Sequence, residues 1–196
     1  MNKKLSLIII LLCAIFGMVW VGSTYNTFVG LDEKVIANWA QVENQYKRRL
    51  DLIPNLVEAV KGYATHEQET LTQVVALRSA AQTAAKNPDL LTDKNAMNNY
   101  IQAQSELSQG LGRLMVIVEK YPDLKANENF MVLQSQLEGT ENRIAVERRN
   151  YIETVREYNT KIRSFPCAMV AKWFGFEQKQ TFDMPQEAET APQIKF

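Results

Sequence analysis

Residues 45–67 read QYKRRLDLIPNLVEAVKGYATHE, and apolar side chains recur in this stretch every three or four positions. That spacing is typical of one face of an α-helix. The stretch also contains a basic cluster, a proline inside the apolar run (Pro54) and the only histidine of the chain, His66. Its interpretation as helix-packing surface, as an anion-binding patch or as a catalytic site decides whether the protein is an enzyme.

The apolar stripe extends from this stretch back to Phe28 and keeps its register across Pro54. A proline inside a helix removes one backbone hydrogen bond and clashes with the carbonyl four residues earlier, here that of Leu50. We therefore expect a kink or short break near residues 50–53. Alternatively, Asp51 caps a new helix that has Pro54 in its first turn. The stripe consists of Phe28, Leu31, Val35, Trp39, Val42, Tyr46, Ile53, Leu56, Val60 and Tyr63.

Three more helices are predicted after this one, each with apolar residues at the same spacing. Short connections make neighbouring helices antiparallel. The sequence therefore predicts an all-α fold, in which an N-terminal transmembrane helix leads into an elongated antiparallel helical bundle of about four long helices. The predicted starts and stops are a Thr65–Gln68 capping box and Asn87-Pro88, then Thr92 or Asp93 and Pro122, then Asn127 or Asn129 and Pro166.

The N-terminus carries an apolar run from Leu5 to Gly22, preceded by two lysines. A run of about 18 to 20 apolar residues spans a bilayer, and a cleaved signal peptide has a shorter apolar core. We expect a retained anchor rather than cleavage after residues 21–23. The lysines should stay in the cytoplasm, which places the remaining residues outside it. The predicted anchor side chains are Leu5, Ile8, Leu12, Ile15 and Val19.

Composition excludes several classes of protein. The chain has 22 basic and 22 acidic residues, and this balance argues against nucleic acid as the main partner. The two cysteines, Cys13 and Cys167, lie near opposite ends of the chain, so a disulfide framework is not expected. Bulky Leu12 before Cys13 argues against lipidation of that cysteine.

No residue pattern predicts a catalytic, metal or cofactor site. A zinc protease motif needs a second histidine one turn after His66, and that position is Thr70. Ser108 lies in no G-x-S-x-G motif. We expect His66 and Glu67 to occupy the solvated start of a helix, with a site centred on His66 as the enzymatic alternative. The basic residues 47–49 are interpreted as a solvated helix face, with anion binding as the alternative.

Four polar residues fall where the apolar stripes predict a packed interior. A buried polar group needs a partner, and such groups often fix register in helical assemblies. Arg49 lies close to the first stripe, and our hypothesis is that it pairs with Glu147 across the bundle. The alternative is that Glu147 reaches water. The four residues are Gln104, Thr140, Glu147 and Thr154.

Residues 165–176, FPCAMVAKWFGF, form a short aromatic segment. Four antiparallel helices return the chain towards the membrane at this point, which places Trp173, Phe174 and Phe176 at the headgroup level. Alternatively, these rings close the end of the bundle. The predicted domains are the anchor (1–24), the bundle (25–165), the aromatic amphipathic segment (166–176) and a polar, flexible tail (177–196).

The motifs LDLIPNLVEAVKGYA, LKANENF and TENRI…RRNY…YNTKIRSFP together resemble the LemA family over about residues 25–176. The resemblance implies a transmembrane helix followed by a helical bundle that faces away from the cytoplasm of a bacterial inner or cell membrane. It implies no enzymatic activity and no cofactor, and a magnetosome-membrane relative points to a role in membrane organisation. Residues of the motifs expected to pack in the bundle are Trp39, Tyr46, Pro54, Leu56 and Tyr63.

Two functions of different classes follow from these patterns. The first is a membrane-anchored, non-enzymatic scaffold that forms homo-oligomers and organises membrane or envelope proteins. The second is a monomeric adaptor or regulator of a membrane protease or envelope-stress system. The expected partners are the bilayer, a second copy of the chain and a membrane protein or protease.

Overall fold

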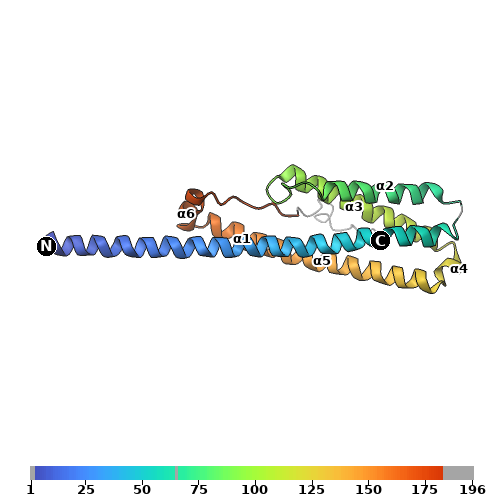
Figure 1. Cartoon of the computed structure of the whole chain (residues 1–196), viewed down its shortest axis with the longest axis horizontal. Helices are drawn as coiled ribbons and strands as arrows, with labels where there is room; N and C mark the ends of the chain where they lie inside the picture. Colours follow the sequence, from blue (N-terminus) through green and yellow to red (C-terminus); the bar gives the residue numbers. More distant parts are fainter. Residues whose placement is uncertain (1–2, 65, 183–196) are drawn as a thin grey trace, which may run out of the picture. The chain divides into compact units, whose positions relative to one another are not determined.

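The computed structural model describes residues 3–64 and 66–182, with side chains from residue 6 onward. These residues contain helices and no strand, so the predicted all-α class is confirmed (Figure 1). Leu5 of the predicted anchor and Thr65 of the predicted capping box lie outside the described side chains. The helices are α1 (Lys3–Lys61), α2 (Gln68–Ala84), α3 (Lys94–Val118), α4 (Pro122–Lys125), α5 (Glu128–Arg163) and α6 (Cys167–Phe174).

The predicted helix boundaries are mostly correct, and side-chain caps explain two of them. Asp93 caps α3 and accepts a hydrogen bond from the Asn95 backbone nitrogen at 2.7 Å. Asn127 precedes α5, and its side-chain oxygen accepts from the Phe130 backbone nitrogen at 3.1 Å. Both interactions satisfy donors that a helix start leaves without an intrahelical partner.

α1 continues without interruption through Pro54, so the predicted break near residues 50–53 and the alternative helix start at Asp51 are wrong. The carbonyl of Leu50 would normally accept from the backbone nitrogen at position 54, which a proline lacks. In the structure this carbonyl accepts a hydrogen bond from Nε of Arg78, on α2, at 2.8 Å. Arg78 therefore supplies the donor that Pro54 removes from the helix.

Replacing Arg78 by methionine should destabilise the protein by about 1 to 3 kcal/mol, because the Leu50 carbonyl loses its donor. Thermal unfolding followed by circular dichroism measures the loss. Pro54→Ala provides the matched control, since an alanine nitrogen at position 54 can bond the Leu50 carbonyl directly. Arg78→Met should cost less than half as much in the Pro54→Ala background as in the natural one. Equal costs in both backgrounds would contradict the exchange of donors.

The chain packs into two compact units, and α1 and α5 contribute to both. The first unit contains α1 up to Asn44, α5 from Ile144 onward, and α6 with residues up to Lys179. The second unit contains residues 45–143, which include the rest of α1 and α5 together with α2, α3 and α4. The single predicted bundle domain, residues 25–165, is therefore divided between the two units.

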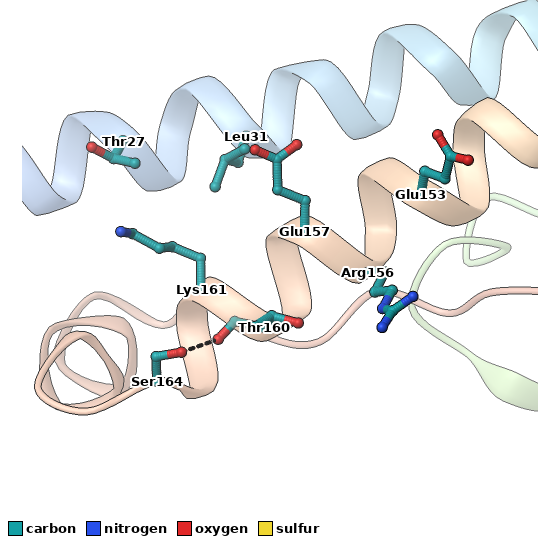
Figure 2. Close-up of a pocket in the computed structure, with 8 residues that line it drawn as sticks. All are labelled: Thr27, Leu31, Glu153, Arg156, Glu157, Thr160, Lys161 and Ser164. Carbon is teal, nitrogen blue, oxygen red and sulfur yellow. Dashed lines mark hydrogen bonds between the residues drawn. The ribbon is translucent and has the colours of Figure 1, made fainter.

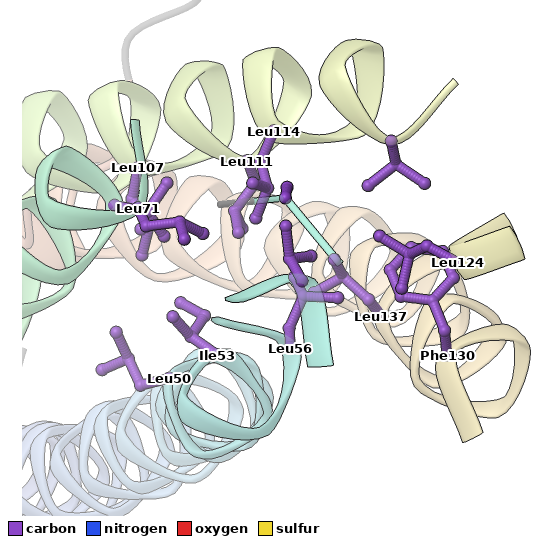
Figure 3. Close-up of a cluster of buried hydrophobic side chains, with 14 of the residues drawn as sticks. Leu50, Ile53, Leu56, Leu71, Leu107, Leu111, Leu114, Leu124, Phe130 and Leu137 are labelled. Atoms are coloured by element: carbon purple, nitrogen blue, oxygen red, sulfur yellow. The ribbon is translucent and has the colours of Figure 1, made fainter. Parts of the chain in front are cut away.

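The second unit has the predicted four-helix core. Apolar side chains from α1, α2, α3 and α5 meet in one cluster, and Leu124 of α4 joins it (Figure 3). α2 and α3 approach closely at Gly110, where a Cβ atom would lie 2.6 Å from Cδ1 of Leu77. Members of the cluster include Leu50, Ile53, Leu56, Leu71, Leu107, Leu111, Leu114, Phe130 and Leu137.

The first unit is built from only two long helices, which run antiparallel. Lys34 Nζ lies 2.9 Å from a carboxylate oxygen of Glu157, and the rings of Trp39 and Tyr151 pack with their centroids 5.1 Å apart. Residues with higher numbers on α1 therefore contact residues with lower numbers on α5. Aromatic and β-branched side chains between the two helices form the core of this unit.

Part of the predicted tail, residues 177–179, makes polar contacts with α1 and α5. The Glu177 carbonyl accepts a hydrogen bond from the Tyr158 hydroxyl at 2.9 Å. Lys179 exchanges two backbone hydrogen bonds with the Asn159 side chain, and its ammonium lies 2.8 Å from an Asp32 carboxylate oxygen. Residues 183–196 of the predicted tail lie outside the described residues.

Candidate functional site

Arg49 is the most deeply buried charged side chain among the described residues, with 1% of its surface exposed. Its guanidinium donates to the Ser108 hydroxyl at 2.7 Å, to a Glu141 carboxylate oxygen at 2.8 Å and to the side-chain oxygen of Gln104. The Tyr46 ring lies beneath the guanidinium, 5.1 Å from its carbon, in a cation–π arrangement. These residues form the Arg49 cluster, which joins α1, α3 and α5 inside the second unit.

The partner predicted for Arg49 is corrected, because the carboxylate that it contacts belongs to Glu141 rather than to Glu147. The Glu141 side chain is 40% exposed, so its charge keeps much of its hydration. Glu147 is half-buried and accepts a hydrogen bond from the Asn150 amide at 3.1 Å. The sequence therefore pointed to Arg49 as a buried cation but did not identify Glu141 as its partner.

The other polar residues of the predicted stripes are buried and have partners. Thr140 donates to the Gln136 carbonyl at 2.7 Å, within α5. Thr154 accepts from the Asn38 amide at 2.6 Å and donates to the Asn150 carbonyl at 2.9 Å. Such bonds make these polar groups tolerable inside a helical core.

The residues expected to pack within the motifs divide into two groups. Trp39, Tyr46 and Leu56 are buried. Pro54 is exposed, and Tyr63 lies beyond the end of α1 with 42% of its surface exposed. The Tyr63 hydroxyl accepts from the Asn127 amide at 3.1 Å, and Ala64 takes the buried position that the stripe predicted for Tyr63.

The basic run and the histidine do not converge on a site. Lys47 and Arg48 are exposed, whereas Arg49 is turned into the core, so the three cations do not share one surface. His66 is exposed just before α2, whose N-cap residue Glu67 makes no side-chain capping bond. Within the described residues, no group of three or more His, Cys, Asp and Glu side chains could hold a metal ion.

The described residues contain one helix, α1, that is long and apolar enough to cross a membrane. An 18-residue window near its N-terminus has a mean hydropathy of 2.4 and is almost wholly unburied. Ile8, Leu12, Ile15 and Val19 of the predicted anchor are all exposed, as lipid-facing side chains should be.

Beyond this window, exposed apolar residues continue along one face of α1. They recur at alternating steps of three and four residues, with β-branched side chains at one heptad position and leucine, methionine or tyrosine at the other. The pattern is interrupted by Gly22 and by Asp32, which pairs with Lys179. We call this face the α1 seam; its residues are Ile8, Leu11, Ile15, Met18, Tyr25, Val29 and Ile36.

The α1 seam was missed in the sequence because a second stripe on the same helix, from Phe28 to Tyr46, has the same spacing. Periodicity alone cannot say which of two stripes packs internally. The structure assigns the second stripe to the core, with Val35 and Val42 fully buried, and leaves Val29 and Ile36 exposed.

The aromatic segment packs against α1 just after its apolar run. Gly175 has a left-handed φ of 74°, ends α6 and allows the chain to reverse. The Phe174 ring lies 4.9 Å from Tyr25, and Phe176 lies 5.2 Å from the buried Phe28 ring. Phe176 therefore closes one end of the first unit, while Trp173 points outward and is 83% exposed.

Two hollows open on the first unit. A groove of about 520 Å³ runs between α1 and α5, and its rim carries both signs of charge (Figure 2). The Ser164 hydroxyl in this groove donates to the Thr160 backbone carbonyl, which is not a catalytic base. A second hollow, of about 540 Å³, lies between Trp20 and Val21 of α1 and Met169 and Trp173 of α6, and its lining is largely apolar.

Glu43, beside Trp39 on α1, is the carboxyl group whose pKa burial raises most clearly, against the lowering effect of a hydrogen bond from Trp39. A carboxyl with a raised pKa binds its proton more tightly in the folded state, so stability falls as pH rises through that pKa. Glu43→Gln should therefore raise the unfolding temperature at pH 7 and leave it unchanged at pH 4. Melting curves at both pH values test this, and an equal effect at both would contradict it.

Burial, together with the nearby carboxylates of Asp32 and Glu177, raises the pKa of Tyr158 to about 12. Its hydroxyl is therefore neutral at physiological pH and acts as a hydrogen-bond donor to the Glu177 carbonyl. Tyr158 thus holds the backbone at Glu177 by a hydrogen bond and does not act as an acid or a base.

Comparison with known proteins identifies related chains. The model of the LemA family matches residues 38–196. Magnetosome protein MamQ of Magnetospirillum gryphiswaldense is 27% identical over 189 residues, which cover 87% of this chain and 70% of the relative. Magnetosome protein MamQ 1 of Paramagnetospirillum magneticum is 26% identical, covering 85% and 67%. Protein LemA of Metamycoplasma hominis is 25% identical, covering 81% and 71%.

Proposed function

Because the chain belongs to the LemA family, we propose that it is a membrane-anchored, non-enzymatic helical scaffold that self-associates outside the cytoplasm. In this proposal α1 crosses a bacterial inner or cell membrane once, with its N-terminus in the cytoplasm. The two units then face the periplasm or the cell surface and organise membrane or envelope proteins. The apolar window of α1 and the magnetosome proteins among the relatives support the membrane part of the proposal.

The observation that supports self-association is the α1 seam. Its N-terminal residues would face lipid in a single copy, but Val29 and Ile36 lie beyond the apolar run and would face water. Apolar side chains aligned in this way on a water-exposed surface are typical of an interaction site. The same register on both sides of the membrane boundary favours one continuous helix–helix contact.

The membrane determines the geometry of this contact. Two copies anchored in the same orientation must bring their α1 helices together in parallel. β-branched residues at one heptad position and leucine-like residues at the other favour parallel two-stranded coiled coils. Ile8, Ile15, Val29 and Ile36 occupy the first position, and Leu11 and Met18 the second. The composition of the seam therefore fits the symmetry that the membrane imposes.

Light scattering during size-exclusion chromatography tests the proposal on the detergent-extracted, full-length chain. We expect a defined assembly of at least twice the 22.4 kDa chain mass. A version lacking residues 1–24 retains only three residues of the α1 seam and should be monomeric, because short coiled coils are marginal in water. A monomer in both forms would contradict self-association and would favour the adaptor or protease-regulator function instead.

The non-enzymatic part has a test of its own. His66→Ala should leave the function of the protein in cells intact, because His66 is exposed and belongs to no cluster of described side chains that could hold a metal. Loss of function in a folded His66→Ala protein would support an enzyme or metal site there.

A further inference from the structure

α6 presents an exposed apolar face beside the membrane-spanning part of α1. Met169 and Trp173 lie four residues apart on this helix, and 68% and 83% of their surfaces are exposed. Residues four apart lie on the same face of a helix. Val170 and Ala171, which lie between these two residues in the sequence, are buried in the first unit. A short helix with one buried and one exposed apolar face requires a second apolar environment.

The hollow of about 540 Å³ lies on this side of α6, and Trp20 and Val21 form its other wall. Its volume is within the range of sites that hold small organic ligands. Trp20 lies within the apolar run of α1, so the hollow opens at the level where the run ends. It is therefore continuous with the surface of α1 that contacts lipid tails.

Among the described residues, the one charged side chain that lines the hollow is a cation. Lys172 lines the hollow. Residues 158–176 contain Lys161, Arg163 and Lys172 and no acidic residue, and residues 5–31 contain no charged residue at all. Basic residues next to a membrane-spanning helix attract the anionic lipids of the leaflet.

We propose that the hollow between α1 and α6 holds an acyl chain of an anionic phospholipid, with the lipid phosphate beside Lys172. Trp173 lies at the headgroup level, where an indole ring can contact both apolar and polar groups. Met169 contacts the acyl chain, since it lines the hollow and is exposed. The site rests on the membrane anchoring in the proposed function and does not require self-association.

Tryptophan quenching in lipid nanodiscs tests the site on the full-length chain. Trp20→Phe leaves Trp173 as the exposed indole, because the remaining tryptophan, Trp39, is buried. Nanodiscs of phosphatidylcholine receive a minor fraction of brominated phosphatidylglycerol or, separately, of brominated phosphatidylcholine. We expect the anionic quencher to act on Trp173 about fivefold more effectively, which is the preference that one lysine near an anionic surface contributes.

Two variants locate the headgroup and the acyl chain. Lys172→Gln should remove the preference for the anionic lipid, while Lys120→Gln, an exposed lysine of the second unit, should retain it. Met169→Glu should reduce quenching by both lipids, while Val116→Glu, equally exposed on α3, should not. Circular dichroism spectra that match those of the natural chain establish that each variant is folded.

Equal quenching by the two lipids, or a preference that Lys172→Gln leaves unchanged, would overturn the proposal. Absence of quenching together with a lower assembly mass for Met169→Glu would also overturn it and would assign the hollow to a second copy of the chain. A monomeric protein that still prefers the anionic quencher would support the lipid site while contradicting self-association. The two proposals therefore fail independently.

Discussion

Replacing Arg49 by methionine should destabilise the protein by about 3 kcal/mol, the lower end of the cost of breaking a buried ion pair. For a chain of this size that loss corresponds to a fall of about 6 to 12 °C in the unfolding temperature. Methionine keeps an unbranched apolar side chain in the core but removes every donor of the guanidinium. Gln104 and Ser108 then lose a charged partner inside the protein.

The effect stays at the lower end of that range because of Glu141. Its side chain is 40% exposed, so water solvates the carboxylate when the arginine is removed. Glu141→Gln should cost less than Arg49→Met, since the amide still accepts a hydrogen bond from the guanidinium. The double variant should cost less than the sum of the two single changes, because both remove the same ion pair.

Arg48→Met provides the matched control, because Arg48 is the exposed neighbour of Arg49. Surface substitutions of this kind usually change stability by less than about 0.5 kcal/mol. Thermal and urea unfolding, followed by circular dichroism, measure all four variants. A fall for Arg49→Met no larger than that for Arg48→Met would show that the Arg49 cluster does not hold the second unit together.

The double substitution Val29→Glu with Ile36→Glu should convert the assembly into monomers. Both residues lie on the part of the α1 seam outside the apolar run, where they are 37% and 43% exposed. In a parallel pair each glutamate faces the same residue of the other chain, and like charges in direct contact repel strongly. The fold of one chain should be unaffected, because neither side chain belongs to the core.

Val116→Glu with Val132→Glu is the control for this change. These valines are at least as exposed, 67% and 55%, and lie on α3 and α5 rather than on the α1 seam. The control should keep the assembly mass of the natural chain in light scattering. Loss of assembly in both double variants would mean that added charge in general, rather than the α1 seam, controls self-association.

Local patterns in the sequence were sufficient to predict the helices. Asp93 and Asn127 were each one of two candidate helix starts, and their side chains cap the helix within three residues of their own position. The burial of Gln104, Thr140 and Thr154 followed from helical periodicity alone. Features that depend on contacts close in sequence were therefore predicted correctly.

Features that depend on contacts between residues distant in the sequence were not predicted correctly. The break at Pro54 was predicted from a local rule, and Arg78, 24 residues later, cancels the reason for the break. No sequence pattern near Pro54 predicts that Arg78 donates to the Leu50 carbonyl. The choice of Glu147 over Glu141 failed in the same way, because the apolar stripe of α5 passes through Glu147 and not through Glu141.

The correct partner of Arg49 lies on α5 within the second unit. Predicting it requires the register of α1 against α5 in that unit, and periodicity within each helix does not supply that register.

The α1 seam and the hollow beside α6 were not predicted for a different reason. Both are surfaces, and a surface is defined by what the core leaves uncovered. The sequence shows two stripes on α1 with the same spacing, and only the packing of α5 decides which one is exposed. The sequence grouped the aromatic residues 173, 174 and 176 together, whereas in the structure Phe176 is half-buried against Phe28 and Trp173 is exposed.

Disulfide cross-linking in membranes tests most directly whether the chain self-associates in parallel through the α1 seam. Val29→Cys is made in full-length protein whose natural cysteines, Cys13 and Cys167, are replaced by serine. A parallel two-fold contact brings the two cysteines within the Cα separation of about 7 Å that a disulfide requires. Thr27→Cys, an exposed position that lines the groove between α1 and α5, is the control. We predict a cross-linked dimer for Val29→Cys and none for Thr27→Cys; no cross-link at either position, or equal cross-linking at both, would contradict a specific α1 contact.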